Sequence, residues 1–246
     1  MQNCKVDIVI PLSCESCSSN LELRMALRSI ERYAGNHGNI YIVSDQPPNW
    51  LQNTVILPVS DKHKHNKDAN IIDKILAAAR LESLTGKFIF WSDDQLALKP
   101  FNTCDMLPAY NNRSREKFRG ENVWHRRMRR TFDFLSAHGR YPAWNWDSHL
   151  PQIMDKEHFK NIMENIDYAA EPGYCVNTLY FGWLNTPPQL PQQAVKATVE
   201  QELFLPELPQ KKIFLGYNDA ACRGNLPRLL KKHFSVRSKF ESNDIK

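Results

Sequence analysis

The amino-acid sequence predicts a single α/β domain built on a mostly parallel sheet. Short apolar runs rich in β-branched residues alternate with segments whose apolar residues recur at helical spacing. This alternation is typical of parallel strands covered by helices. The 246 residues suit one large domain, and we find no internal repeat and no change of composition that would mark a second one.

Four strands are expected in the first part of the chain. They are residues 5–12, 39–45, 54–59 and 87–91. The third contains Pro58, so it is expected at an edge of the sheet.

Helical spacing of apolar residues predicts the helices, and most of the second half of the chain is expected to be helical. The expected helices span residues 23–34, 71–79, 124–137, 156–166 and 220–234.

Polar stretches follow three of the four expected strands, at residues 13–20, 44–45 and 92–94. Ligands of open α/β sheets bind beyond the carboxyl ends of the strands. We therefore expect these three stretches to converge on one crevice.

Composition and charge limit the classes of protein. The 42% hydrophobic and 24% charged residues are ordinary for a globular chain, and no apolar run approaches the length of a membrane span. Without a recognisable signal peptide, the expected location is a cytoplasm, where the six cysteines would be thiols. Cys14 and Cys17 have C-x-x-C spacing, but no second such pair completes a zinc site. The net charge of +5 fits an enzyme that binds phosphates.

Asp93 and Asp94 are the strongest local signal for chemistry. Two adjacent carboxylates after a buried strand are costly unless a charge compensates them, and Mg²⁺ or Mn²⁺ prefers oxygen ligands and bridges phosphates. The alternative is a helix cap or a solvated turn. We expect a divalent metal at Asp93 and Asp94, where it would assist departure of a diphosphate.

Asp147 and His149 form a second candidate pair. Asp147 could accept a proton from an acceptor hydroxyl, and His149 could ligate the metal or orient the acceptor. The alternative is that His149 stabilises a turn before Pro151. Together with Asp94, these two residues are the predicted catalytic groups.

A basic and amide-rich stretch opens the second expected helix. Its side chains suit phosphate or nucleotide contacts because a helix N-terminus is electropositive. A solvated helix start with its cap is equally compatible. The residues concerned are Asn66, Lys67, Asn70 and Lys74.

The helix expected at residues 124–137 is rich in arginine. It could hold a diphosphate or follow a nucleic-acid backbone, and neighbouring tryptophans could stack on sugars or bases. The alternative is a solvated helix face. The predicted acceptor- or phosphate-binding residues are Arg126, Arg127, Arg130, Trp144 and Trp146. A further basic run, Lys231, Lys232, Arg237 and Lys239, lies near the end of the chain.

Several segments resemble known families. Residues 23–33, 40–45, 48–51, 88–94 and 148–159 resemble the Stealth family of sugar-phosphate transferases. Residues 66–74, 145–149 and 217–219 are similar to small phage-encoded proteins described as nucleotide-sugar transferases.

The resemblance implies a Rossmann-like type-A glycosyltransferase (GT-A) fold and a UDP- or GDP-sugar donor. Residues 1–110 would form the nucleotide-binding half and residues 111–246 the acceptor-binding half. The donor's base would lie near Leu12, Ser13 and Asp45, and its diphosphate near Ser92 and Asp93. A phage origin would place the protein in the host cytoplasm.

One departure from the Stealth pattern bears on the reaction. Stealth proteins carry an acidic Trp-Val-Asp-Gly-like loop after the first strand, and this chain has Pro11-Leu-Ser-Cys14 there. We therefore expect metal-dependent transfer of a sugar to an acceptor hydroxyl rather than transfer of a sugar phosphate to a surface glycan. The acceptor would be a glycan or a hydroxymethylated base in phage DNA. The expectation from another class is a non-catalytic nucleic-acid-binding protein.

Overall fold

The structure, a computed structural model, describes residues 4–13, 20–108, 114–187, 194–197 and 213–242. Its main sheet has five strands. In spatial order they are β4 (Val55–Leu57), β3 (His37–Val43), β1 (Val6–Pro11), β5 (Lys87–Phe90) and β8 (Gln152–Asp155). The first four are parallel and β8 is antiparallel to β5, so the predicted mostly parallel α/β sheet is confirmed.

The strand order locates a ligand-binding edge. Numbered along the chain, the sheet reads 3-2-1-4-5, and the direction of winding reverses between β1 and β5. In open α/β sheets such a reversal opens a crevice at the carboxyl ends of the two strands. The polar residues that follow β1 and β5 therefore stand beside this crevice.

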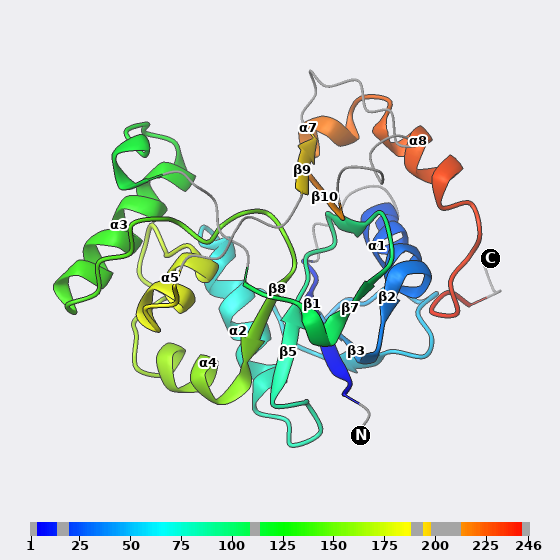
Figure 1. Cartoon of the computed structure of the whole chain (residues 1–246), viewed down its shortest axis with the longest axis horizontal. Coiled ribbons are helices and arrows are strands. Elements are labelled where there is room, and N and C mark those ends of the chain that lie inside the picture. Colours follow the sequence, from blue (N-terminus) through cyan, green and yellow to red (C-terminus); the bar gives the residue numbers. More distant parts are fainter. Residues whose placement is uncertain (1–3, 14–19, 109–113, 188–193, 198–212, 243–246) are drawn as a thin grey trace.

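Helices cover both faces of the sheet, as Figure 1 shows. α1 (Leu21–Tyr33) packs on the face that carries Ile8 and Ile40. The opposite face, which carries Val9 and Tyr41, is covered by the other helices of the main sheet. These are α2 (Lys67–Ala79), α4 (Lys156–Met163) and α5 (Val176–Trp183), with α3 (Val123–Ala137) packed against α5. Burial on both faces explains why these strands are continuous apolar runs.

The second half contains more strand than expected. β8 joins the main sheet, and a second sheet has the order β6 (Gln95–Ala97), β10 (Phe214–Tyr217), β9 (Ala194–Ala197). β2 (Ala34–Gly35) and β7 (Phe101–Asn102) form a third pair. The prediction of a mainly helical second half is therefore wrong for residues 152–155, 194–197 and 214–217.

The final expected helix is divided. α7 (Asp219–Cys222) and α8 (Leu226–His233) are separate, and α8 contacts α1 instead of returning to the main sheet. Among the described residues, no helix combines the length and the apolar character needed to cross a membrane.

Cysteine chemistry differs from the expectation. A disulfide joins Cys4, just before β1, to Cys104, just after β7. The prediction of free thiols is therefore wrong for these two residues, and it holds for Cys175 and Cys222. Cys14 and Cys17 lie outside the described residues.

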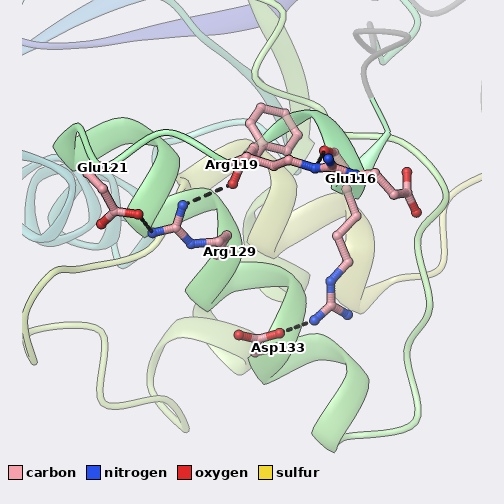
Figure 2. A pocket seen from close by; sticks show the side chains of 7 residues that line it. Glu116, Arg119, Glu121, Arg129 and Asp133 are labelled. Carbon is pink, nitrogen blue, oxygen red and sulfur yellow. Dashed lines mark hydrogen bonds and ion pairs between the residues drawn. The ribbon is translucent and has the colours of Figure 1, made fainter.

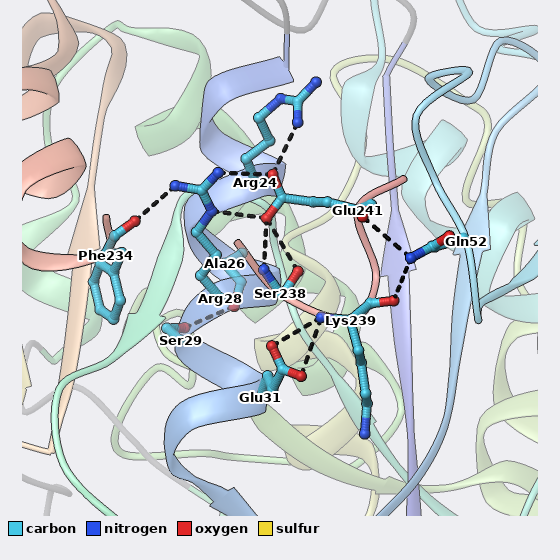
Figure 3. Close-up of polar contacts among 10 residues, drawn as sticks. All are labelled: Arg24, Ala26, Arg28, Ser29, Glu31, Gln52, Phe234, Ser238, Lys239 and Glu241. Atoms are coloured by element: carbon cyan, nitrogen blue, oxygen red, sulfur yellow. Dashed lines mark hydrogen bonds and ion pairs between the residues drawn. The ribbon is translucent and has the colours of Figure 1, made fainter. Parts of the chain in front are cut away.

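The segment after α8 is fastened to α1 by a buried carboxylate. Glu241 accepts hydrogen bonds from Arg28 at 2.7 and 2.8 Å and from Arg24 at 2.9 Å (Figure 3). Its side chain is fully buried, and Ser238 donates to it as well. Burial opposes the charged form, but these donors outweigh it and lower the pKa of Glu241 to about 2.

Candidate functional site at the switch point

The candidate site lies where β1 and β5 end. β5 runs into Trp91, which is buried, and then into Ser92, Asp93 and Asp94, which are partly exposed. Leu12 follows β1, and its backbone N–H donates to Val43 at the end of β3. Leu12–Ser13, Ser44–Asp45 and Ser92–Asp94 follow the parallel strands β1, β3 and β5, so they lie at the same edge of the sheet, and their convergence on one crevice stays a prediction. Residues 14–19 lie outside the described residues.

Asp94 and His149 are in direct contact. Asp94 Oδ2 lies 3.0 Å from His149 Nε2, and the same nitrogen lies 2.7 Å from the carbonyl oxygen of Tyr217. Because a carbonyl oxygen only accepts, Nε2 carries the hydrogen, and the ring would reach a metal only through Nδ1. The sequence correctly placed His149 beside Asp94, but the geometry favours a positioning role over ligation through Nε2.

Backbone geometry holds His149 in this place. Its φ of 58° is in the left-handed region, which is unfavourable for a residue with a side chain. β10 comes so close that a Cβ added to Gly216 would lie 2.5 Å from the His149 carbonyl oxygen. The absence of a side chain at Gly216 therefore permits the contact between His149 and β10.

Asp93 and Asp94 carry negative charge that nearby residues compensate incompletely. Burial, followed by the charges of Asp94 and Glu22, raises the pKa of Asp93 to about 7. Asp94 Oδ1 is buried and has no hydrogen-bond partner among the described residues. Since buried carboxylate oxygens are normally satisfied, an additional donor or cation would be stabilised here.

Tyr217 contributes a second buried group without a partner. Its backbone N–H donates to the Asp94 carbonyl oxygen at 3.1 Å, and its hydroxyl makes no hydrogen bond in the described part of the chain. Burial and the nearby charges of Glu22, Cys222 and the two aspartates raise the pKa of Tyr217 well above its usual value. The phenol therefore stays protonated and can donate.

Asp147 lies at the N-terminus of α5. Its Oδ2 accepts from Thr178 Oγ1 at 2.5 Å and from Thr178 N at 3.2 Å. Burial raises the pKa of Asp147, while the hydrogen bonds from Thr178 and Asn177 act in the opposite direction. Asp147 as a residue is partly exposed, and the bonds from Thr178 fix the orientation of its carboxyl group.

Asp68, which the sequence analysis did not select, belongs to the same electrostatic cluster. It forms an ion pair with Arg127 at 2.7 Å between Oδ2 and Nη1. Burial is the main reason that the pKa of Asp68 rises to about 6. Arg127 opposes this rise, and the charge of Asp147 adds to it. The sequence contains no signal for this pair because Asp68 and Arg127 are brought together only by packing of α3 near α2.

Three of the nine residues predicted to bind the nucleotide, Asn66, Asn70 and Lys74, have structural roles. Asn66 caps α2 by accepting from Ala69 N, and its amide nitrogen donates to two backbone carbonyl groups. Asn70 bonds the backbone of residues 62 and 63. Lys74 is buried, and its Nζ bonds the Leu12 carbonyl oxygen at 2.7 Å and Asp61 at 2.5 Å. These side chains shape the crevice wall and are not available to phosphates.

Leu12 is buried, so the prediction that its side chain contacts the donor's base is not supported. The other nucleotide candidates are at least partly exposed. Asp45 and Lys67 are exposed, and Ser13 is partly exposed and bonds Asp61 through its hydroxyl. Lys67 begins α2, and its charge lowers the pKa of both Asp93 and Asp68. A cation at this helix start is therefore electrostatically connected to the acids of the crevice.

The arginine-rich face of α3 is largely engaged within the protein. Arg127 is buried and donates to the carbonyl oxygens of Pro172 and His65. Arg130 donates to Ala170 and Glu171 and lies over the Tyr174 ring. Arg126 is exposed. The prediction that Arg127 and Arg130 contact an acceptor is therefore not supported by their geometry, and Arg126 alone of the three remains accessible.

A shallow hollow of about 600 Å³ lies beside α3, but its cations are also paired (Figure 2). Arg129 donates to the carbonyl oxygens of Phe118 and Gly120 and contacts Glu121, while Arg115 contacts Asp133. The hollow therefore offers few uncompensated positive charges.

Of the two tryptophans predicted to stack on an acceptor, one is buried and one is partly exposed. Trp146 is 2% exposed, and its ring centroid lies 5.1 Å from that of Phe181. The prediction that Trp146 stacks on an acceptor is therefore wrong, because this ring belongs to the core. Trp144 is partly exposed, so the prediction for Trp144 stays open.

Within the described ranges, no group of three or more His, Cys, Asp or Glu side chains is arranged to hold a metal ion. No protein-family model matches the chain. A search of curated proteins also finds no match. The candidate function therefore rests on this chain's own residues and on the switch-point geometry.

Proposed function

We propose that this chain is a metal-dependent glycosyltransferase of the GT-A type. It would move a sugar from a UDP- or GDP-sugar to an acceptor hydroxyl in the crevice between β1 and β5. The observation that carries the proposal is the pair Asp93–Asp94 at the switch point, with one buried carboxylate oxygen lacking a partner. The resemblance of residues 66–74, 145–149 and 217–219 to phage-encoded proteins described as nucleotide-sugar transferases supports the same reading.

Asp93 and Asp94 fit a hard cation. Both supply oxygen ligands, and Asp94 Oδ1 has no partner in the described part. Burial, followed by the charges of Asp94 and Glu22, raises the pKa of Asp93, and a nearby cation would oppose this rise. A Mn²⁺ or Mg²⁺ ion held by these carboxylates would neutralise charge on a leaving diphosphate.

The neighbouring residues have distinct roles in this proposal. His149 holds Asp94 through the contact between Nε2 and Oδ2, and the bond to the Tyr217 carbonyl oxygen keeps the ring oriented. Asp147 is the proposed base, because its orientation is fixed by Thr178 and burial favours its protonated form. Lys67 at the start of α2 is the proposed cation for the phosphates.

Asp94→Asn tests the metal-site claim. The variant should lose donor turnover while retaining its fold, because the amide preserves shape and removes the charge. The measurement is release of UDP or GDP from a panel of nucleotide sugars with Mn²⁺, with circular dichroism as the check on folding. Asp167→Asn, at an exposed acid outside the crevice, is the matched control and should retain turnover. Wild-type turnover in Asp94→Asn would refute the assignment.

Binding can be tested independently of the acceptor. UDP or GDP with Mn²⁺ should raise the melting temperature of the wild-type chain, since a ligand that binds only the native state stabilises it by mass action. The same additions should leave Asp94→Asn unchanged. A wild-type chain that responds to no nucleotide would favour the non-catalytic reading instead.

The mass of the reaction product distinguishes transfer of a sugar from transfer of a sugar phosphate, and shows which acceptor is modified. A glycan and a hydroxymethylated DNA duplex would each be incubated with the donor panel and examined by mass spectrometry. Addition of a sugar alone supports the proposal, whereas addition of a sugar plus phosphate indicates the Stealth-type reaction. For DNA, Arg126→Gln should weaken binding and reduce its salt dependence, and an unchanged salt slope would remove α3 from the interface.

A further inference from the structure

The strongest unpaired positive charge of the described residues lies on and after α8. Residues 220–240 contain six Lys or Arg residues and no Asp or Glu, whereas the whole chain has a net charge of only +5. The rest of the chain is therefore close to neutral. We call these six side chains the C-terminal basic surface: Arg223, Arg228, Lys231, Lys232, Arg237 and Lys239.

Packing of α8 leaves its own cations, Arg228, Lys231 and Lys232, exposed. Leu226 and Leu230 are each 2% exposed and pack in a cluster with Leu96 and Leu215 of the second sheet. All six residues of the C-terminal basic surface are exposed. The apolar side of α8 therefore packs in the protein's own core, and its cationic side chains are exposed to solvent.

Nearby acids do not neutralise this surface. Glu241 is enclosed by Arg24 and Arg28, and Glu31 accepts from the backbone N–H of Lys239 (Figure 3). No ion pair joins any of the six cations to a described acid, in contrast to the paired arginines of α3. The positive charge is thus available to a partner.

An exposed aliphatic side chain lies within the same segment. Val236 is 80% exposed, more than any other large hydrophobic residue of the described chain. It stands beside Arg237, shortly after Lys231 and Lys232. By contrast, the aromatic rings of the segment, Phe234 and Phe240, are each 2% exposed and cannot stack on bases.

We propose that the C-terminal basic surface docks on a membrane surface rich in anionic lipids, with Val236 entering the interfacial region. Exposed Lys and Arg side chains each gain about 1 kcal/mol, or about fivefold in affinity, near a surface of anionic headgroups, and an exposed aliphatic side chain gains free energy in the interface. A nucleic-acid backbone would use the cations but would give Val236 no apolar environment. The proposal does not depend on the chain being a glycosyltransferase.

The docking surface lies close to the candidate site. α7 immediately precedes α8, and Cys222 of α7 contacts Glu22 at the start of α1 at 3.2 Å. In Figure 1, α7 and α8 stand on the side of the molecule opposite α3. Docking through α8 would therefore bring the α1 and α7 side of the crevice toward the membrane.

The test uses the full chain and sedimentation with lipid vesicles. Wild type should bind vesicles of mixed phosphatidylglycerol and phosphatidylcholine, should not bind pure phosphatidylcholine, and should bind more weakly as salt increases. Lys231→Gln with Lys232→Gln should weaken binding about 25-fold, from about fivefold per cation near an anionic surface. Val236→Ser should weaken it several-fold at a salt concentration that screens the charges.

The matched control is Lys62→Gln with Lys64→Gln, which removes the same charge from exposed lysines elsewhere. Equal losses in both double variants would overturn the proposal, because binding would then depend on net charge alone. Failure of wild type to bind anionic vesicles would also overturn it. Binding of a DNA duplex that depends on Lys231 and Lys232, without vesicle binding, would assign the surface to nucleic acid. None of these binding assays measures nucleotide turnover, so a chain without turnover would contradict the proposed function and leave this proposal unaffected.

Discussion

At the scale of single residues, two buried tyrosines offer a matched test of the partnerless hydroxyl. Tyr217→Phe should leave the free energy of unfolding unchanged or raise it slightly, because it removes a buried hydroxyl with no partner among the described residues. Tyr180→Phe should lower it by about 1 kcal/mol, because its hydroxyl accepts from Asp155 N at 2.9 Å. Urea unfolding measures both. A loss in Tyr217→Phe as large as in Tyr180→Phe would show that the Tyr217 hydroxyl is satisfied.

Glu241 predicts a specific dependence of stability on pH. Its pKa falls from 4.5 to about 2 on folding, so its contribution is complete above pH 4.5 and is lost as the pH falls toward 2. The shift corresponds to about 3 kcal/mol. Wild type should therefore exceed Glu241→Gln in unfolding free energy at pH 7, and the difference should shrink by pH 3. A difference that is constant with pH would contradict the assigned ion pairs.

The sequence predicted the residues of the candidate site unevenly. Asp93, Asp94 and His149 were found because strand ends and short motifs are local patterns, and the structure brings Asp94 and His149 together. The prediction that Trp146 stacks on an acceptor was wrong, because an amino-acid sequence does not show which aromatic rings are buried. Glu22 and Tyr217 were missed as site residues. Each lies in an ordinary helix or strand, and only tertiary packing brings it close to Asp93 and Asp94, which are distant in the sequence.

At the scale of elements, the approach of β10 to the loop that carries His149 can be tested by adding one methyl group. Gly216→Ala would place a Cβ 2.4 Å from His149 Cδ2, so the imidazole should move and its contact with Asp94 should be lost. We expect donor turnover to fall at least tenfold, about 1.4 kcal/mol of transition-state stabilisation. Gly86→Ala, where nothing lies within 4 Å, is the control. Equal turnover in the two variants would mean that β10 does not position His149.

Elements were predictable where the physical signal was local. The strands β1, β3 and β5 are largely buried apolar runs, β4 is a short apolar run at the sheet edge, and α1 to α4 carry regular apolar stripes, so all were expected. β8 and β10 were missed because each has only four residues and owes its conformation to a partner far along the chain. Such pairings follow from tertiary packing, which one sequence does not display.

At the scale of the whole molecule, the disulfide makes a prediction about stability. Cys4 and Cys104 are separated by 100 residues, so the bond constrains a large loop of the unfolded chain. Cys104→Ser should lower the unfolding free energy by about 5 kcal/mol under non-reducing conditions in the chain-entropy view. Cys222→Ser, at a cysteine that is not part of a disulfide, is the control, because the hydroxyl can keep the hydrogen bond to Glu22. Alkylation of Cys4 and Cys104 without prior reduction, detected by peptide mass mapping, would contradict the pairing.

The position of β8 also bears on how the chain folds as it leaves the ribosome. β5 is finished at residue 90, yet the neighbour that pairs with it on the outer side comes from residues 152–155. Until those residues emerge, a nascent chain with β1 and β5 already paired presents an open, apolar strand edge, the kind of edge on which chains aggregate. Translation of the intervening residues is therefore the interval in which this protein most needs a chaperone.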